Sequence, residues 1–126
     1  MRWLALIALL PAPAWALDCS SAVTQADMVA CAQSEYEAVD ADLNDAYRFA
    51  MRKAKGLDEF MPDQKPGFVA VLRDAQRAWI PFRDKACTAQ AYKYSGGSME
   101  RLEYISCLTM MTERRTDDLY YWASDR

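Results

Sequence analysis

Two pairs of acidic residues come closest to a catalytic arrangement in this 126-residue chain: Glu37 with Asp40, and Asp117 with Asp118. Glycoside hydrolases use two carboxyl groups of this kind, one as an acid and the other as a base or nucleophile. That chemistry needs a pocket that raises the pKa of one carboxyl group. Both pairs fall on segments with helical patterning and without signs of a pocket, so we interpret them as solvated surface acids.

Other catalytic and cofactor-binding patterns are missing from the sequence. The chain has no histidine, the residue most often used as a general base and as a metal ligand. Its serines lie outside any G-x-S-x-G turn, and its four glycines form no phosphate-binding loop. We therefore predict that the protein is not an enzyme and that it holds no cofactor or metal.

A second group of chemically capable residues lies within residues 75–87, which read A-Q-R-A-W-I-P-F-R-D-K-A-C. Gln76 and Arg83 are seven residues apart and project from nearly the same side of a helix, next to Trp79. They border an apolar seam with steps of three and four residues: Phe68, Leu72, Ala75, Trp79, Phe82, Ala86 and Ala89. This pattern predicts a helix that buries Trp79 and Phe82 as core anchors, with its polar side chains bonded to neighbouring helices.

Prolines and glycines set the expected limits of this middle helix. Pro66 suits its first position, where the missing N–H would have no helical partner, and residues 94–97 (Y-S-G-G) should end it. Pro81 lies inside the helix, where it removes one hydrogen bond and crowds the carbonyl of Arg77, so we expect a kink.

Helical patterning predicts two further long helices. Thr24, followed three residues later by Asp27, is placed to cap the first, which should end at Lys55–Gly56 before a loop over residues 57–65. Its inward positions have a period near 3.5: Met28, Ala32, Tyr36, Val39, Leu43, Ala46 or Tyr47, Ala50 and Ala54. Ser98 should cap the third helix, with inward positions Leu102, Ile105, Leu108, Thr112, Thr116 and Leu119. The fold is therefore predicted to be all-α, a small disulfide-tied bundle of three long helices in one domain over residues 17–126.

Four cysteines support the expectation of disulfides: Cys19, Cys31, Cys87 and Cys107. Their even number, without a C-x-x-C pair or a histidine, favours two disulfides over a zinc site in an oxidising compartment. Of the three connectivities we favour Cys19 with Cys31 and Cys87 with Cys107, because each closes a short loop.

The first sixteen residues have the layout of a secretory signal. Arg2 precedes an apolar run over residues 3–10, and P-A-P-A-W-A follows with an A-x-A cleavage pattern. We predict a signal peptide over residues 1–16, cut after Ala16, and a periplasmic or secreted product. No later stretch has the roughly twenty apolar residues of a membrane helix.

Acidic residues are concentrated early in the chain. The formal net charge is -3, and residues 18–47 contain no base but seven acids: Asp18, Asp27, Glu35, Glu37, Asp40, Asp42 and Asp45. Such a field repels nucleic acid and attracts a basic partner. The simpler interpretation is a solvated helix face that keeps the protein soluble.

Several short motifs together resemble one family. They are Asp18-Cys19, Cys31-Ala32, Leu43-Asn44-x-x-Tyr47, Ala75-Gln76-x-Ala78-Trp79-x-x-Phe82-Arg83-Asp84-x-x-Cys87, Gly96-Gly97-Ser98 and Cys107-Leu108-x-x-x-Thr112-x-x-Arg115-x-x-x-Leu119. Their order and spacing over nearly the whole mature chain resemble the LprI-type lysozyme-inhibitor domain, although Phe82 stands where that family more often has tyrosine. The resemblance implies a disulfide-tied helical domain of the cell envelope and, for some members, inhibition of lysozyme.

An inhibitor of a basic c-type lysozyme would be attracted by negative charge and would need a projecting loop to enter the catalytic cleft. Residues 57–65 are our candidate for that loop, and its proposed contact residues are Asp58, Glu59, Phe60 and Asp63. The loop over residues 95–98 is a smaller alternative.

The alternative function is a periplasmic binding or interaction module. The resemblance marks residues that would meet inside the bundle or along a polar groove: Asn44, Tyr47, Gln76, Trp79, Arg83, Thr112 and Arg115. Such a groove would receive a peptide or glycan, with Trp79 stacking and the arginines holding a carboxylate. In a purely structural role, Arg83 or Arg115 would instead pair with Asp40 or Asp84.

Overall fold

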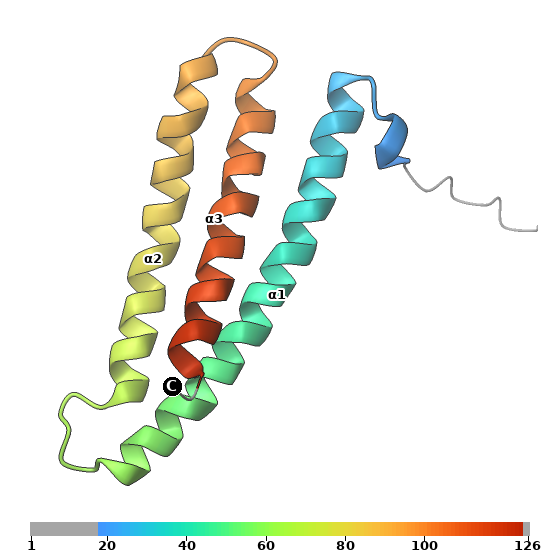
Figure 1. The fold of residues 1–126 in the computed structure, drawn as a ribbon. Helices are drawn as coiled ribbons and strands as arrows, with labels where there is room; N and C mark the ends of the chain where they lie inside the picture. The colour runs from blue at the N-terminus through green and yellow to red at the C-terminus, as the bar shows by residue number, and fades with distance from the viewer. Residues whose placement is uncertain (1–17, 125–126) are drawn as a thin grey trace, which may run out of the picture.

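A computed structural model describes residues 18–124 of the chain, and the predicted signal peptide lies outside them. Three long helices, α1 (Gln25–Phe60), α2 (Phe68–Ala91) and α3 (Glu100–Ala123), are joined by short connections (Figure 1). Two short 3-10 helices, η1 (Cys19–Ser21) and η2 (Tyr92–Tyr94), precede α1 and follow α2. The all-α prediction of three long helices is therefore confirmed, and no helix of the described part is long and apolar enough to cross a membrane.

The start of α1 follows the sequence, but its end does not. The Thr24 hydroxyl accepts a hydrogen bond from the Asp27 N–H at 3.1 Å, as a helix cap does. The prediction that α1 ends at Gly56 is wrong, because the helix continues to Phe60 and the Met61 N–H closes it on the Leu57 carbonyl. A glycine inside a helix costs only about 1 kcal/mol, which packing of the same helix end against α2 offsets.

Both other helices begin later than the sequence predicted. Helix α2 starts at Phe68, not at Pro66, because the Asp58 carboxylate accepts hydrogen bonds from the N–H groups of Phe68 and Val69 at 2.6 and 3.1 Å. It runs uninterrupted through Pro81, and the kink expected there stays a prediction. Met99 rather than Ser98 occupies the N-cap position of α3.

Small residues along α1 form the centre of the core. Ala46, Ala50 and Ala54 recur every four residues with no exposed surface, so α3 packs closely and more extensively on α1 than on α2. Three leucines and one more alanine complete this core: Leu43, Leu72, Leu119 and Ala123.

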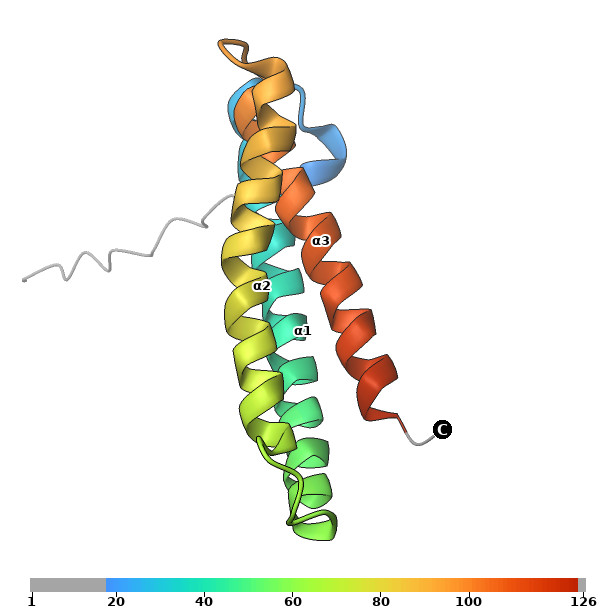
Figure 2. The same ribbon diagram turned by 90° about the vertical axis from the view of Figure 1, so that its left-hand side faces the viewer.

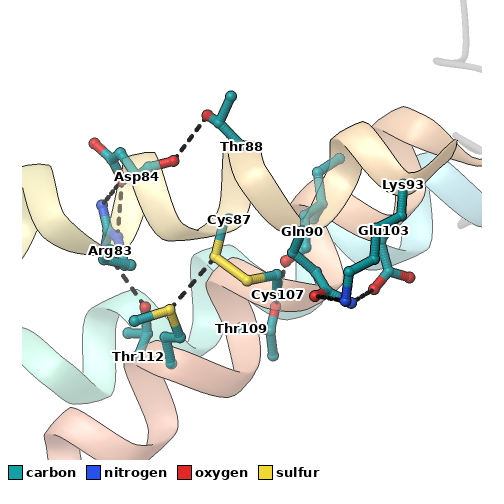
Figure 3. Close-up of a disulfide and its surroundings, with 12 residues drawn as sticks. Arg83, Asp84, Cys87, Thr88, Gln90, Lys93, Glu103, Cys107, Thr109 and Thr112 are labelled. Carbon is teal, nitrogen blue, oxygen red and sulfur yellow. Dashed lines mark hydrogen bonds and ion pairs between the residues drawn. A yellow bond between two sulfur atoms is a disulfide. The ribbon is translucent and has the colours of Figure 1, made fainter. Parts of the chain in front are cut away.

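Two disulfides have the predicted connectivity. Cys19 is bonded to Cys31, and Cys87 to Cys107. The second bond links α2 to α3 with a Cα–Cα distance of 5.4 Å and is buried with Leu108, next to Met111 (Figure 3). It fixes both the spacing of these helices and their rotation at that end.

The buried stripe of α2 lies one residue beyond the predicted seam. Its buried members are Leu72, Gln76, Arg83, Cys87 and Ala91, whereas Ala75, Phe82 and Ala89 are exposed. Phe82 is 62% exposed, so its predicted role as a core anchor is wrong. The disulfide explains the rotation, because turning Cys87 inward also turns Arg83, one helical turn earlier, into the core.

Helices α2 and α3 are close at one end and apart at the other. The disulfide and the η2 connection hold them together at the first end. Toward its C-terminus, α3 inclines away from the N-terminal half of α2 (Figure 2). The bundle is thus splayed where α2 begins and α3 ends.

Candidate functional site

A buried arginine occupies the middle of the bundle. Arg83 is 7% exposed, and its Nε donates to Asp84 Oδ1 at 3.0 Å while Nη1 donates to Thr112 Oγ1 of α3 at 3.4 Å (Figure 3). Its Nη2 lies 2.9 Å from the same Asp84 oxygen, and Asp40 of α1 is 4.0 Å from Nη1. One guanidinium therefore contacts all three helices, which fixes their register.

Trp79 contacts two guanidinium groups. The ring centroid is 5.2 Å from the Arg83 guanidinium carbon and 5.9 Å from that of Arg115, both within the range of a cation–π interaction. The Nε of Arg115 donates to Gln76 Oε1 at 2.9 Å, a second polar link between α2 and α3.

The ring of Tyr36 on α1 also packs against the Arg83 guanidinium. Its ring centroid is 5.7 Å from the Arg83 guanidinium carbon. Burial raises the pKa of the Tyr36 hydroxyl, and the positive charge of Arg83 offsets part of that rise.

The polar residues singled out in the sequence fall into two sets. One set is joined by direct contacts: Gln76, Trp79, Arg83, Thr112 and Arg115. Asn44 and Tyr47 instead line a cavity of 460 Å³ between α1 and α2, together with Gln76 and Arg83. Thr112 is fully buried and out of reach of a ligand.

A further cavity was not anticipated from the sequence. It has a volume of 570 Å³ and lies at the splayed ends of α2 and α3, with Arg115 in its wall. Phe68, Leu72 and Ala75, three members of the predicted seam, line it. The sequence signal for this cavity was the apolar seam itself, because three helices do not cover its first part.

The connection between α1 and α2 forms a tip at one end of the molecule (Figure 1). Phe60 is 83% exposed there, and Glu59 and Asp63 are exposed on either side of it. Asp58 is half-buried and bonded to the start of α2. Of the four predicted contact residues, three thus face solvent and the fourth holds the tip in place.

The alternative loop, residues 95–98, is anchored from two sides. Gly96 has a positive φ of 81°, a conformation that favours glycine, and its N–H donates to Glu100 Oε2 at 3.2 Å. Gln25 of α1 donates to the Ser98 carbonyl at 2.7 Å. Within the described residues, no group of three acidic or cysteine side chains is arranged to hold a metal ion.

A family model described as "Lysozyme inhibitor LprI" matches residues 18–119. The chain belongs to the LprI family. The family that the sequence motifs resembled is thereby confirmed, and as a family of inhibitors LprI proteins are not classed as enzymes. The two disulfides of this LprI-family chain fit an exported protein.

Two curated relatives carry no assigned function in their names. An uncharacterized protein of Rhizobium meliloti (strain 1021) is 38% identical over 105 residues, covering 81% of this chain and 76% of that protein. The uncharacterized protein YecT of Escherichia coli (strain K12) is 32% identical over 96 residues, and the match covers 71% of this chain but only 58% of YecT.

A solved structure has the same fold as this LprI-family chain. The crystal structure of a DUF1311 family protein from Pseudomonas putida KT2440 aligns with a TM-score of 0.68 at 19% identity. The alignment covers 82% of this chain and 97% of that one, so the helical arrangement extends over almost the whole of the solved protein.

Proposed function

We propose that the protein inhibits a basic c-type lysozyme by inserting the α1–α2 tip into the catalytic cleft. The observation that carries the proposal is the exposure of Phe60, an aromatic side chain that is 83% exposed and flanked by the acids Glu59 and Asp63. Aromatic side chains that fill a pocket of the partner supply much of the binding energy of many interfaces, and Phe60 is exposed where it can do so. Membership of the LprI family supports the choice of partner.

Hydrogen bonds within the chain order the tip. Both oxygens of the Asp58 carboxylate accept hydrogen bonds from the first residues of α2, and the Gln64 N–H donates to the Met61 carbonyl at 3.1 Å within the turn. A preformed contact loop loses less conformational entropy on binding than a flexible one. The tip therefore meets a requirement of a tight inhibitor.

Negative charge on α1 attracts a basic partner over a longer range. Glu35, Glu37 and Asp42 are exposed on the N-terminal half of this helix. From Asp42 to Phe60 the helix rises by about 27 Å, close to the diameter of a small domain. A globular partner of that size reaches from the acidic half of α1 to the tip, across a segment that carries Arg48, Arg52 and Lys55. The acids therefore act on the approach of the partner, and the tip makes the specific contact.

The test is to mix the purified, oxidised protein with a c-type lysozyme, to measure cell-wall lysis, and to measure binding by calorimetry at low and moderate salt. We expect saturable inhibition at one-to-one stoichiometry and an affinity that falls as salt rises. Undiminished lysis with no heat of binding at micromolar protein would reject the proposal.

The second candidate, an interaction module with one polar groove around Trp79, Arg83 and Arg115, has less support. The Arg83 side chain is buried, and its donors are directed to Asp84 and Thr112. Arg115 differs from Arg83 because it is only partly buried and borders the cavity at the splayed end.

A further inference from the structure

The cavity between α2 and α3 has the size and walls of a small-molecule site. Its 570 Å³ fall within the range of roughly 300–1,000 Å³ typical of ligand pockets. Apolar side chains form most of its wall, chiefly Phe68, Val71, Leu72, Leu119 and Trp122. Val71 is 51% exposed, so apolar surface is left facing solvent here. Burying that surface against a ligand is favourable, at about 25 cal/mol per Å².

Arg115 brings a positive charge into this apolar wall, and Asp118, the acid that lines the same cavity, is not ion-paired with it. Its guanidinium is partly buried, donates one hydrogen bond to Gln76, and contacts the Trp79 ring. Within residues 18–124 it forms no ion pair, in contrast to Arg83, which has Asp84. A partly buried guanidinium without an acid favours an anion that arrives from outside.

The remaining donors of Arg115 have no hydrogen-bond partner within the described residues. A guanidinium has five N–H donors, and only the one on Nε is used by Gln76. No buried side-chain nitrogen or oxygen in the described part lacks a hydrogen-bond partner, so the unused donors of Arg115 reach solvent. A carboxylate entering the cavity can therefore bind them in the two-pronged geometry that arginine favours.

The topology places the charge at one end of the cavity and the apolar surface at the other. Helices α2 and α3 run in opposite directions (Figure 1). The hydrogen bond from Arg115 to Gln76 marks the end of the cavity that is nearer to Trp79. On α2, Phe68 lies seven residues from Ala75, and on α3, Trp122 lies seven residues from Arg115. Each separation is about 10 Å along the helix axis. The walls thus match a molecule with an anionic head and an apolar body.

We propose that this cavity binds a free fatty acid or a comparable single-chain monocarboxylate, with the carboxylate on Arg115 and the chain between Phe68, Leu119 and Trp122. Asp118 also lines the cavity, and its negative charge disfavours a ligand with a second negative charge. The site accordingly favours a ligand with one negative charge over a phosphate group that carries two. This inference does not depend on lysozyme inhibition, because none of the residues proposed to contact lysozyme lines the cavity; Gln64 and Pro66 of the α1–α2 connection border it at one end.

The test uses decanoate, below its micelle-forming concentration, titrated into the purified oxidised protein with calorimetry as the readout. Two probes separate the contributions: acetate carries the carboxylate without the chain, and decyltrimethylammonium carries the chain with the opposite charge. We expect saturable one-to-one binding of decanoate and none of the other two in the same range. Absence of decanoate binding at millimolar ligand, or equal binding of the cationic amphiphile, would overturn the proposal.

Matched variants assign the binding to this cavity. Arg115→Gln should weaken decanoate binding by about tenfold or more, the effect of losing one charge-assisted contact, whereas Arg114→Gln on the exposed neighbour should not. Val71→Gln, in the cavity wall, should also weaken binding, whereas Ile80→Gln should leave it unchanged, because Ile80 is similarly exposed but lines the α1–α2 cavity. Circular dichroism checks that each variant is folded. Equal affinities within both pairs would show that decanoate binds elsewhere and would reject the site.

Discussion

The carboxylate of Asp58 occupies the space in which a side chain at position 67 would lie. A Cβ built on Gly67 would be 2.7 Å from Asp58 Oδ1, closer than real carbon–oxygen contacts allow. The missing side chain lets the end of α1 approach the start of α2, so that Asp58 can accept hydrogen bonds from Phe68 and Val69. One acid and one glycine therefore determine how the tip is built.

Removing this cap should destabilise the fold. We expect Asp58→Ala to lower the free energy of unfolding by about 0.5 to 2 kcal/mol, the range measured for helix caps. Gly67→Ala should also lower it, because the new methyl group displaces the carboxylate. Urea denaturation provides the measurement, and Asp63→Ala, at an exposed acid of the same connection, serves as the control and should change stability by no more than about 0.5 kcal/mol. A fully stable Asp58→Ala variant would show that the cap contributes nothing.

Arg83 should behave as a structural residue. Arg83→Ala removes the contacts with Asp84 and Thr112 and leaves Thr112 buried without that donor. Because Asp84 is partly solvated, we expect a loss of about 2 to 3 kcal/mol, less than for a fully buried pair. The exposed Arg77→Ala on the same helix is the control in thermal denaturation. A stable Arg83→Ala variant would return the residue to the list of binding candidates.

The tip should carry the lysozyme affinity if the proposed function is correct. Phe60→Ala should weaken binding by about tenfold or more, as expected for a central aromatic contact. Phe82→Ala is a matched control, because Phe82 is also exposed but lies on α2 beyond the tip. The double variant Glu59→Gln/Asp63→Asn should reduce both the affinity and its dependence on salt. Inhibition constants that none of these changes alter would exclude the tip as the contact.

The two disulfides should contribute unequally to the free energy of unfolding. Loss of Cys87–Cys107, which closes 20 residues, should cost about 3 kcal/mol from chain entropy, and more if the buried contacts with Leu108 loosen. Cys19–Cys31 ties only η1 to α1, so the loss of that bond should leave the three-helix core intact. Comparing unfolding of the two Cys→Ala double variants tests this order; a larger loss for the Cys19/Cys31 variant would contradict it.

Tyr36 should make the fold sensitive to alkali. Burial raises the pKa of Tyr36 above its ordinary value of 10.0, so the folded protein holds this proton more tightly than the unfolded chain does. The resulting stability is fully present below pH 10 and is lost as the pH rises through the folded-state pKa. Tyr36→Phe should therefore flatten the fall in melting temperature above pH 10, whereas Tyr92→Phe, at an exposed ring, should not. Parallel curves for Tyr36→Phe and the unaltered protein would contradict this assignment.

Local pattern predicted the helices well and their limits less well. The Thr24 cap depends on neighbours within one turn, so it was visible in the sequence. The extension of α1 past Gly56 depends on a bond from Asp58 to residues ten and eleven positions later. Helix propensity gives the free-energy cost of a glycine inside a helix, but it does not include a hydrogen bond to a residue on another helix.

The sequence by itself determined the three helices and favoured the cysteine pairing that the structure has, because helical periodicity and short loops are local properties. The polar residues near Trp79 were indicated by the family resemblance. Only the tertiary structure decided which face of α2 points inward. Two stripes one residue apart are nearly equivalent in pattern, and the bond from Cys87 to Cys107 selects the stripe that buries Gln76 and Arg83. That selection leaves Phe82 in solvent.

The tertiary structure also decided where the cavity lies. Because α2 and α3 splay apart, the first part of the apolar seam is not covered, and it lines a cavity there; three helices cannot enclose the seam along its full length.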